Sequence, residues 1–305
     1  MTKIMLEGKE YTVKSKSEIN KVSQFLATEK FQHIPIKTPE EIEKLKFSGN
    51  ICAKILDEIS PHIKSGVTRK SLNDLILNLI RNYQAEVDRL TTDAATDAGA
   101  RISACFGHNN IIVNAEPNNT ELRPGDIFGI DISIKKNGWC GDTRKTWLIG
   151  EEISPTVLSL YATSHKAMWL AISMVKAGVK ISDIANAVEQ YANLNGFAMI
   201  KLPITCGHSL GKAHFDGWLI PLYNDEVNKG RVLKEGMVIT IETFMSAGSG
   251  EGYILNNDVG SAITKDGAPA CYWEHAIAVT KQGCEILDLR AGEKEEWSKP
   301  AEEYS

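Results

Sequence analysis

The sequence predicts an α+β protein made of two related halves, because one stretch of it nearly repeats another. Residues 122–131 read LRPGDIFGID and residues 233–242 read LKEGMVITIE, so each copy carries a glycine turn and an apolar run that ends in a carboxylate. A second match, KSGV at 64–67 and KAGV at 176–179, precedes a helical pattern in each half. The two matches have nearly the same offset, which a chance recurrence of helices, turns and strands does not readily produce.

The composition is that of a soluble globular protein. The chain has 305 residues, of which 43% are hydrophobic and 24% charged, enough to bury a sizeable core. Its net charge of -5 argues against nucleic acid or an acidic membrane as the main partner, since both are anionic. Charges interrupt the N-terminus too early for a signal peptide, and no apolar run could span a bilayer, so we expect a cytoplasmic protein. The cysteines are widely spaced without a C-x-x-C pair, which favours free thiols.

The domain organisation follows from where the helical patterns start. Residues 1–36 are a polar, mixed-charge extension of unknown role, with one helical pattern at 17–30. The main domain begins where Thr38, Pro39 and Glu41 combine a helix N-cap, a proline in the first turn and a capping box. We expect one domain over residues 37–292, with halves of about 37–150 and 151–292, followed by a polar tail at 293–305.

Each half is predicted to begin with two helices. In the first half, apolar residues recur at helical spacing and form one buried face: Ile42, Leu45, Ile51, Cys52, Ile55, Leu56 and Ile59. A second helix follows the KSGV turn at about 72–83. In the second half, Ser154 and Pro155 repeat the opening signal, and another helix follows at about 184–194.

A β-hairpin is predicted around the Asn-Gly pair at 137–138, which is the strongest short hairpin signal. A two-residue turn there sets a register in which Asp131 faces Arg144 and Ser133 faces Asp142. Because alternate residues of a strand share a face, Asp131 and Asp142 become diagonal neighbours on the same side of the hairpin.

The second half supplies further candidate ligands. They are His208 in a Cys-Gly-His motif, Glu242 at the end of its strand, and Glu274 at the start of an apolar run. We expect Glu274 to stand toward Glu242 as Asp142 stands toward Asp131, with a long excursion in place of the tight turn.

These four acids and His208 predict a metal site. A carboxylate that ends an apolar strand is costly to bury unless its charge is stabilised. Two close carboxylates also raise each other's pKa unless a cation lies between them. The oxygen-rich ligand set suits two divalent ions such as Mn, Fe(II), Co or Zn. The alternative is an exposed hairpin face on which Asp142 pairs with Arg144 or Lys145.

Together these motifs resemble the methionine aminopeptidases of the M24 family, metal-dependent exopeptidases of the pita-bread (creatinase/aminopeptidase) fold. The resemblance covers about residues 36–290 and rests on four motifs: Asp131-x10-Asp142, Cys-Gly-His208-x-x-Gly, Thr-Ile-Glu242, and Glu274-His275 before an apolar strand. It implies duplicated helices, related by a pseudo-two-fold axis, around a curved and mostly antiparallel sheet.

The resemblance also implies residue roles. Asp131 would chelate one ion, Asp142 and Glu274 would bridge both, and His208 and Glu242 would complete the second. A water bridging the ions would be the nucleophile, with Glu242 as its proton acceptor. His214 resembles the family histidine that hydrogen-bonds the substrate carbonyl, although it follows His208 by six residues instead of seven. The substrate would be the N-terminal residue, most often methionine, of a peptide or nascent protein, and the enzyme would be a monomer or homodimer.

The chain departs from the family pattern at Asn114, which stands where the family has a catalytic histidine. An asparagine can donate a hydrogen bond near the scissile amide, but it cannot exchange a proton near pH 7. Cys105 and Phe244 match positions near the family's substrate side-chain pocket, and packing in the core is the alternative for both.

Two other functions stay open. Asn114 motivates an enzyme of the same fold that acts on X-Pro peptides, small amides or a biosynthetic intermediate. A non-catalytic binding protein on this fold is the alternative from another class, and the five metal ligands stand against it. A substrate panel separates the two enzymes, and metal titration separates an enzyme from a binding protein.

Overall fold

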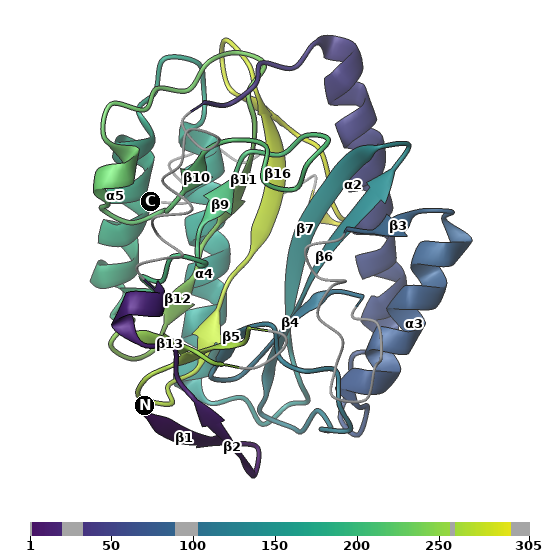
Figure 1. Cartoon of the computed structure of the whole chain (residues 1–305), viewed down its shortest axis with the longest axis vertical. Helices are drawn as coiled ribbons and strands as arrows, with labels where there is room; N and C mark the ends of the chain where they lie inside the picture. Colours follow the sequence, from purple (N-terminus) through teal and green to yellow (C-terminus); the bar gives the residue numbers. More distant parts are fainter. Residues whose placement is uncertain (1, 20–32, 89–102, 257–259, 294–305) are drawn as a thin grey trace.

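The computed structural model describes residues 2–19, 33–88, 103–256 and 260–293 (Figure 1). The helical pattern predicted at 17–30 and the polar tail predicted at 293–305 fall almost entirely outside these residues. In the described parts, no helix is both long enough and apolar enough to cross a membrane. All six cysteines are free, as predicted.

The first half begins with the two predicted helices. Helix α2 (Pro39–Ile59) has the predicted N-cap, because the Thr38 hydroxyl accepts the N–H of Glu41 and the Glu41 side chain accepts the N–H of Thr38. Its predicted apolar face is buried except for Ile42, which is half-buried. Helix α3 (Arg69–Asn82) follows the glycine turn and is capped by the Thr68 hydroxyl.

The second half repeats this arrangement closely. Helix α4 (Pro155–Met174) has 20 residues against 21 in α2, and α5 (Ile181–Leu194) has 14, as α3 does. The turns between the helices match as well. Gly66 and Gly178 both have positive φ, and their N–H groups donate over 2.9 Å to the carbonyls of Leu122 and Leu233. The two related halves predicted from the repeat are therefore present.

Within the described residues, the main sheet has ten strands, all paired antiparallel. Eight of them run in the spatial order β11 (Val238–Glu242), β16 (Glu274–Val279), β7 (Trp139–Leu148), β6 (Ile127–Lys136), β4 (Cys105–His108), β5 (Ile111–Val113), β14 (Ala262–Thr264) and β13 (Gly252–Ile254). The other two are β17 (Cys284–Ile286), which pairs with β16, and β3 (Glu86–Val87), which pairs with β6.

Shorter elements complete the fold. Two two-stranded sheets pair β1 (Lys3–Leu6) with β2 (Lys9–Thr12) and β9 (Gly207–His208) with β10 (Leu219–Ile220). A three-stranded sheet contains β15 (Ala270–Cys271), β12 (Met245–Ser246) and β8 (Ala198–Met199). Two short 3-10 helices are η2 (Ser60–His62) and η3 (Glu226–Asn228).

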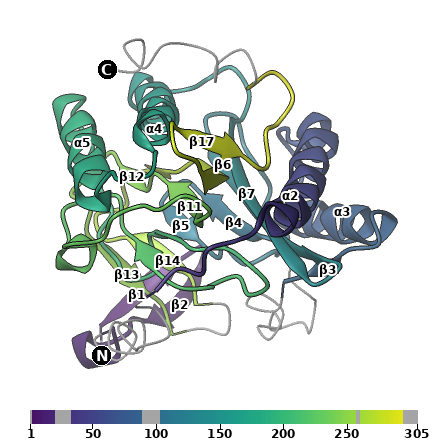
Figure 2. The ribbon, with the colours of Figure 1, turned by 90° about the horizontal axis from the view of Figure 1, so that it is seen from above.

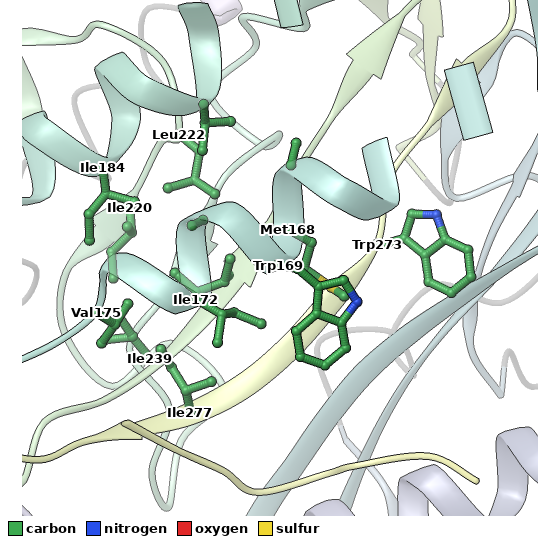
Figure 3. Packing of buried hydrophobic residues seen from close by; sticks show 14 of the residues in the cluster. Met168, Trp169, Ile172, Val175, Ile184, Ile220, Leu222, Ile239, Trp273 and Ile277 are labelled. Carbon is green, nitrogen blue, oxygen red and sulfur yellow. The ribbon is translucent and has the colours of Figure 1, made fainter. Parts of the chain in front are cut away.

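The helices lie on the outside of the sheet, one pair for each half. Seen from above, α4 and α5 lie at one side and α2 and α3 at the other, with the strands between them (Figure 2). In the second half, Met168, Trp169 and Ile172 of α4 pack in one cluster with Ile239 of β11 and Ile277 of β16 (Figure 3). Burial of such side chains supplies most of the stability that holds helices on a sheet.

The hairpin of β6 and β7 has the predicted register, with Asp131 opposite Arg144 and Ser133 opposite Asp142. Its turn residues, Asn137 and Gly138, have φ of 52° and 80°, as a tight two-residue turn of this kind requires. The turn fixes the register, and the register fixes which acids share a face.

The expected relationship between Glu242 and Glu274 was wrong. These two acids lie directly opposite each other on β11 and β16, whereas Asp131 lies opposite Arg144. Glu274 therefore holds the position of Arg144 in the first half, and not that of Asp142. The long connection between β11 and β16 contains no tight turn, so the sequence offered nothing that fixes the register of this pair.

The N-terminal hairpin of β1 and β2 was not predicted. Its turn residues Glu7 and Gly8 both have positive φ, at 50° and 80°. The signal was a Glu-Gly pair between two short runs that carry apolar residues, which is weaker than Asn-Gly. The Glu7 carboxylate forms two hydrogen bonds with the fully buried Arg69, at 2.7 and 2.5 Å. The extension of unknown role is thus fastened to the first half.

Candidate metal centre and substrate pocket

Four neighbouring strands each contribute one acid to the same place, and all but the half-buried Asp131 are buried. In the order of the sheet these are Glu242 on β11, Glu274 on β16, Asp142 on β7 and Asp131 on β6 (Figure 1). Ligand atoms of Asp131, Asp142 and Glu274 all lie within 4.8 Å of one another, and so do those of His208, Glu242 and Glu274. The five residues that the sequence predicted as metal ligands are therefore brought together.

His208 reaches the acids from β9, which lies against β11. Gly207 permits the close approach, because a Cβ there would lie 2.4 Å from the backbone oxygen of Thr240. Nδ1 of His208 lies 3.2 Å from the carbonyl oxygen of Ser209, and if it donates there, the Nε2 lone pair is free. Nε2 lies 3.4 Å from Asp142 Oδ2 and 3.8 Å from Glu242 Oε1. This is the orientation that a metal-ligating histidine needs.

Hydroxyl groups orient three of the four acids. Ser133 donates to Asp142 over 2.6 Å, Tyr272 to Asp131 over 2.9 Å, and Thr240 to Glu242 over 2.8 Å. Oε2 of Glu274 is buried and has no hydrogen-bond partner among the described residues. A buried carboxylate oxygen with no hydrogen-bond partner, inside a cluster of acids, is free to coordinate a cation.

Burial and mutual repulsion shift the pKa values of the acids. Burial, and then the charge of Asp142, raise the pKa of Asp131 to about 7. Burial and the neighbouring carboxylates raise the pKa values of Glu242 and Glu274 well above the usual range. Burial acts in the same direction on Asp142, but His214 and His208 outweigh it and lower the pKa of that carboxyl. The four acids can therefore all be ionised at once only if positive charge is added between them. Their oxygen atoms are suitable ligands for divalent metal ions.

Arg144 lies on the same face as the acids but is directed away from them. A Cβ on Gly129 or Gly107 would lie 2.0 or 2.4 Å from its Nη2, so this pair of facing glycines makes room for the guanidinium. The guanidinium stacks on the ring of Tyr272 at 3.4 Å and donates to its backbone carbonyl. The alternative of an ion pair between Asp142 and Arg144 on an exposed face is wrong, because both residues are buried and no such pair forms.

His214 lies at the same centre. Its ring centroid is 4.4 Å from that of His208, and its Nδ1 lies 3.4 Å from both Asp142 Oδ2 and Asp88 Oδ2. Burial acts to lower the pKa of His214, but Asp142 and Asp88 outweigh it and raise the pKa. A six-residue spacing from His208 thus still brings the second histidine to the acids.

A pocket of about 430 Å³ opens beside these residues, a size suited to a small ligand. All five predicted ligands line it, and so do His214, Asn114, Cys105 and Phe244. The Phe244 ring stacks on Tyr272 at 3.9 Å, and Cys105 Sγ lies 3.9 Å from the Tyr272 hydroxyl. Cys105 and Phe244 are therefore both packed in the core and exposed to the pocket, so the two alternatives for them are compatible.

Asn114 stands in a left-handed backbone conformation, with φ of 56°, which asparagine tolerates better than most residues. Its side-chain amide donates over 3.4 Å to the carbonyl of Gly260, and its own carbonyl accepts from the Ser261 hydroxyl at 2.6 Å. Its N–H donates to Cys105 Sγ. The residue is thus held at the wall of the pocket, where it offers an amide and no titratable group.

Sequence reasoning missed several residues of the site. Thr240 and Ser133 carried a signal, because Thr240 lies two residues before Glu242 on one strand and Ser133 faces Asp142 in the hairpin. Asp88 and Tyr272 lie just after short strands, and they come close to the acids only when the whole sheet is folded. A larger pocket of about 720 Å³ lies beside this one and shares Cys206 with it, but none of the clustered acids line it.

Residues 43–281 match the family described as metallopeptidase family M24. The methionine aminopeptidase of Escherichia coli strain K12 is 32% identical over 271 residues, which covers 84% of this chain and 94% of the relative. The methionine aminopeptidase of Rickettsia prowazekii strain Madrid E is 32% identical over 257 residues, which covers 84% of this chain and 95% of the relative.

Solved structures agree with these relatives. The crystal structure of methionine aminopeptidase from Rickettsia prowazekii superposes with a TM-score of 0.76 at 31% identity, over 84% of this chain and 100% of that one. An X-Pro aminopeptidase from Thermotoga maritima has a TM-score of 0.63 at 22% identity, over 83% of this chain and 62% of that one, which shows a shared fold alone. These matches confirm the α+β pita-bread fold that the sequence predicted.

Proposed function

Because the chain belongs to metallopeptidase family M24, we propose that it is an aminopeptidase that removes N-terminal methionine from peptides or proteins with two divalent metal ions. The class of metal-dependent aminopeptidase follows from the family and its relatives. One observation carries the finer proposal. Five oxygen and nitrogen donors from adjacent strands converge in the wall of a pocket that also has an apolar side. We take residues 37–292 as the catalytic unit.

The positions of the acids support a set of five metal ligands. Asp131, Asp142, His208, Glu242 and Glu274 would together hold the two ions. Carboxylate and imidazole ligands suit Mn, Fe(II), Co or Zn, and the orphaned Glu274 oxygen and the raised pKa values support a cation here. When bound, the ions lower the pKa of water and polarise the scissile carbonyl.

The chain's own residues move the proton and position the substrate. Glu242 receives the proton that the attacking water loses and then delivers it to the leaving amine. The hydroxyl of Thr240 donates to one oxygen of Glu242 and so holds the carboxylate in place. His214 donates a hydrogen bond to the carbonyl oxygen as negative charge develops on it. Asn114 donates a hydrogen bond near the scissile amide but moves no proton.

The pocket suits an unbranched apolar side chain. Phe244, Tyr272 and Cys105 form a wall of rings and a sulfur, with Val113 and Ile204 nearby on the same lining. A thioether makes favourable contacts with aromatic rings and with such a polarisable surface. This supports methionine as the residue removed.

The test is an assay of the purified protein on Met-Ala-Ser with Fe(II), Mn(II), Co(II) and Zn(II) added separately under anaerobic conditions. We expect turnover with at least one metal, and its loss in the Asp142→Asn variant together with the loss of tight metal binding. Full turnover by that variant would refute the ligand assignment. Absence of turnover of any Met-peptide with every metal would refute the aminopeptidase proposal.

A second candidate of the same chemistry is an enzyme that hydrolyses another N-terminal amide. Asn114 favours it, because the titratable group of the family pattern is missing from the pocket wall. A panel with X-Pro peptides and small amides decides between the two. Activity confined to Met-peptides would exclude this candidate.

A further inference from the structure

The N-terminal segment Val13–Ile19 forms one edge of the substrate pocket, although it lies outside the family match that begins at residue 43. Val13 bridges to Leu255, and the N–H of Lys14 donates over 2.8 Å to the carbonyl of Ile254. The N–H of Asn256 in turn donates to Thr12 over 2.8 Å. The segment therefore lies along the end of β13, held there by one isolated bridge and two further backbone hydrogen bonds.

Side chains of this segment reach the pocket. Ile19 packs against the apolar cluster that contains Phe244, Ile254 and Tyr272, all of which line the pocket. Lys14 lines the pocket itself and is half-buried. The extension whose role the sequence left open thus supplies part of the substrate site.

Among the described residues, Lys14 is the only lysine or arginine that lines this pocket. Its ammonium donates over 3.4 Å to the neutral side-chain oxygen of Asn256, a long contact with an uncharged acceptor. The acids that line the pocket belong to the proposed metal centre. A half-buried cation with a neutral partner attracts an anion from solution, because less water screens it than at the surface.

Lys14 stands on the same edge of the pocket as Asn114. The Asn114 amide donates to Gly260, and the neighbouring Ser261 accepts the N–H of Leu255, which bridges to Val13. Gly260 lines the pocket, and nothing lies within 4 Å of where its Cβ would be. Asn114, Gly260 and Lys14 therefore all line the same pocket and are linked through neighbouring backbone contacts.

We propose that Lys14 is a specificity residue that binds a carboxylate of the peptide substrate. The carboxylate can be an acidic side chain that follows the N-terminal methionine or the C-terminal group of a short peptide, and the ammonium would recognise either in the same way. The inference rests on the proposed function, because it names which peptides the same site prefers. It gives the N-terminal segment a part in substrate choice.

The experiment compares peptides that differ only in a carboxylate, using the metal-loaded protein. One arm uses Met-Ala-Ser with a free or amidated C-terminus, and the other uses Met-Ala-Glu-amide against Met-Ala-Gln-amide. We expect about a tenfold higher kcat/KM for the carboxylate member of one arm, mostly through KM. The arm that shows the preference identifies the source of the carboxylate.

Variants of Lys14 assign the preference to this side chain. Lys14→Met should abolish it, Lys14→Glu should reverse it, and Lys14→Arg should keep most of it. Lys16→Met is the matched control, because Lys16 lies on the same segment, is exposed and does not line the pocket. A preference that survives in Lys14→Met, or that is absent from the unmodified protein in both arms, would overturn the proposal.

The two proposals fail in different ways. Turnover of Met-Ala-Ser-amide by the unmodified protein and by Lys16→Met supports the aminopeptidase function, whether or not a carboxylate on the peptide changes kcat/KM. If no peptide is hydrolysed, calorimetric titration of the metal-loaded protein with the acid and amide peptides still tests Lys14. Equal affinities for the two members of each pair would then overturn the assignment to Lys14.

Discussion

Asp88 Oδ2 lies 3.4 Å from Nδ1 of His214, so a second carboxylate, besides Asp142, contacts the imidazole of this histidine. Asp88 is nearly buried and comes directly after β3, and its other oxygen lies 3.9 Å from the ammonium of Lys135. A carboxylate in this position holds an imidazole in one orientation and favours its protonated form.

Asp88→Asn should therefore impair catalysis without removing a metal ligand. We expect kcat to fall by about 10- to 100-fold with little change in KM, because His214 loses the partner that orients it. The limb of the pH profile that reports His214 should also move to lower pH, since Asp142 remains but Asp88, the second charge that raises the pKa of His214, is gone. Lys135→Met serves as the control. An unchanged kcat in Asp88→Asn would exclude the orienting role.

Glu274→Gln should have opposite effects on the metal-free and metal-loaded protein. Without metal the variant should be at least as stable as the unmodified protein, because burial and the neighbouring carboxylates already disfavour the charged form of Glu274, and glutamine is neutral. With metal at 100 times its Kd, the unmodified protein should gain about 2.7 kcal/mol, and the variant should gain much less. Thermal unfolding with and without Mn(II) measures both. Glu235→Gln, which changes an exposed acid of the same half, should behave like the unmodified protein.

Metal binding should release protons below about pH 7. The metal-free protein holds Asp131 with a pKa of about 7, and Glu242 and Glu274 with pKa values well above the usual range. Metal ions bind the ionised forms, so affinity should rise with pH and the number of protons released should fall as Asp131 ionises. Calorimetry at pH 6 in buffers of different ionisation enthalpy measures this number. Binding heats that do not depend on the buffer would contradict the pKa shifts.

Asn114→His should add an ionisation to the reaction. Histidine tolerates the positive φ of this position, so the variant should fold. We expect a pH dependence of kcat/KM with a new limb near pH 6.5, and about a tenfold gain on Met-Ala-Ser at pH 7.5. Asn114→Ala, which removes the amide donor, is the comparison and should lose activity. Equal activities of the two variants would show that the side chain at 114 does not contact the reacting amide.

Glu7→Gln should destabilise the protein at pH 7 and not in acid. Burial acts to raise the pKa of Glu7, but its hydrogen bonds and charge pairing with Arg69 outweigh it and lower the pKa. This contribution is therefore complete above the unfolded pKa of about 4.3 and is lost as pH falls through the lower folded value. We expect about 2 kcal/mol at pH 7, less than for a fully buried pair because Glu7 is partly exposed.

Denaturant unfolding of the Glu7 variant across pH 2.5–7 measures that loss. Glu10→Gln is the matched control on the same hairpin, because Glu10 pairs with an exposed lysine. A stability difference between Glu7→Gln and the unmodified protein that persisted at pH 2.5 would contradict the ion-pair account.

The parts of the fold that local chemistry determines were predictable from the sequence. The Asn-Gly turn fixed the register of β6 and β7, and with it the positions of Asp131 and Asp142. The caps at Thr38 and Ser154 fixed where α2 and α4 begin. In each case residues close in sequence contain the whole signal.

The parts that depend on closure of the whole fold were not predictable. Tyr272 bonds to Asp131 across 141 positions of sequence, and Lys14 reaches the pocket only because its segment pairs with β13. The pairing of Glu242 with Glu274 was mistaken for the same reason, since a long connection leaves the register to tertiary packing. Such contacts have no local pattern to reveal them.

The two halves meet where β5 pairs with β14 and, beside the acids, where β7 pairs with β16 through Arg144 with Glu274 and Thr143 with His275. Arg290 reinforces this junction by donating to Thr143 Oγ1 and to the carbonyls of Arg144 and Glu274. Asp131 and Asp142 stand on one side of the junction, and Glu242 and Glu274 on the other. Cations bound among these acids would cross-link the two halves. Without metal, the protein should therefore be inactive and should also open more often between the halves, which makes it easier for proteases to cut.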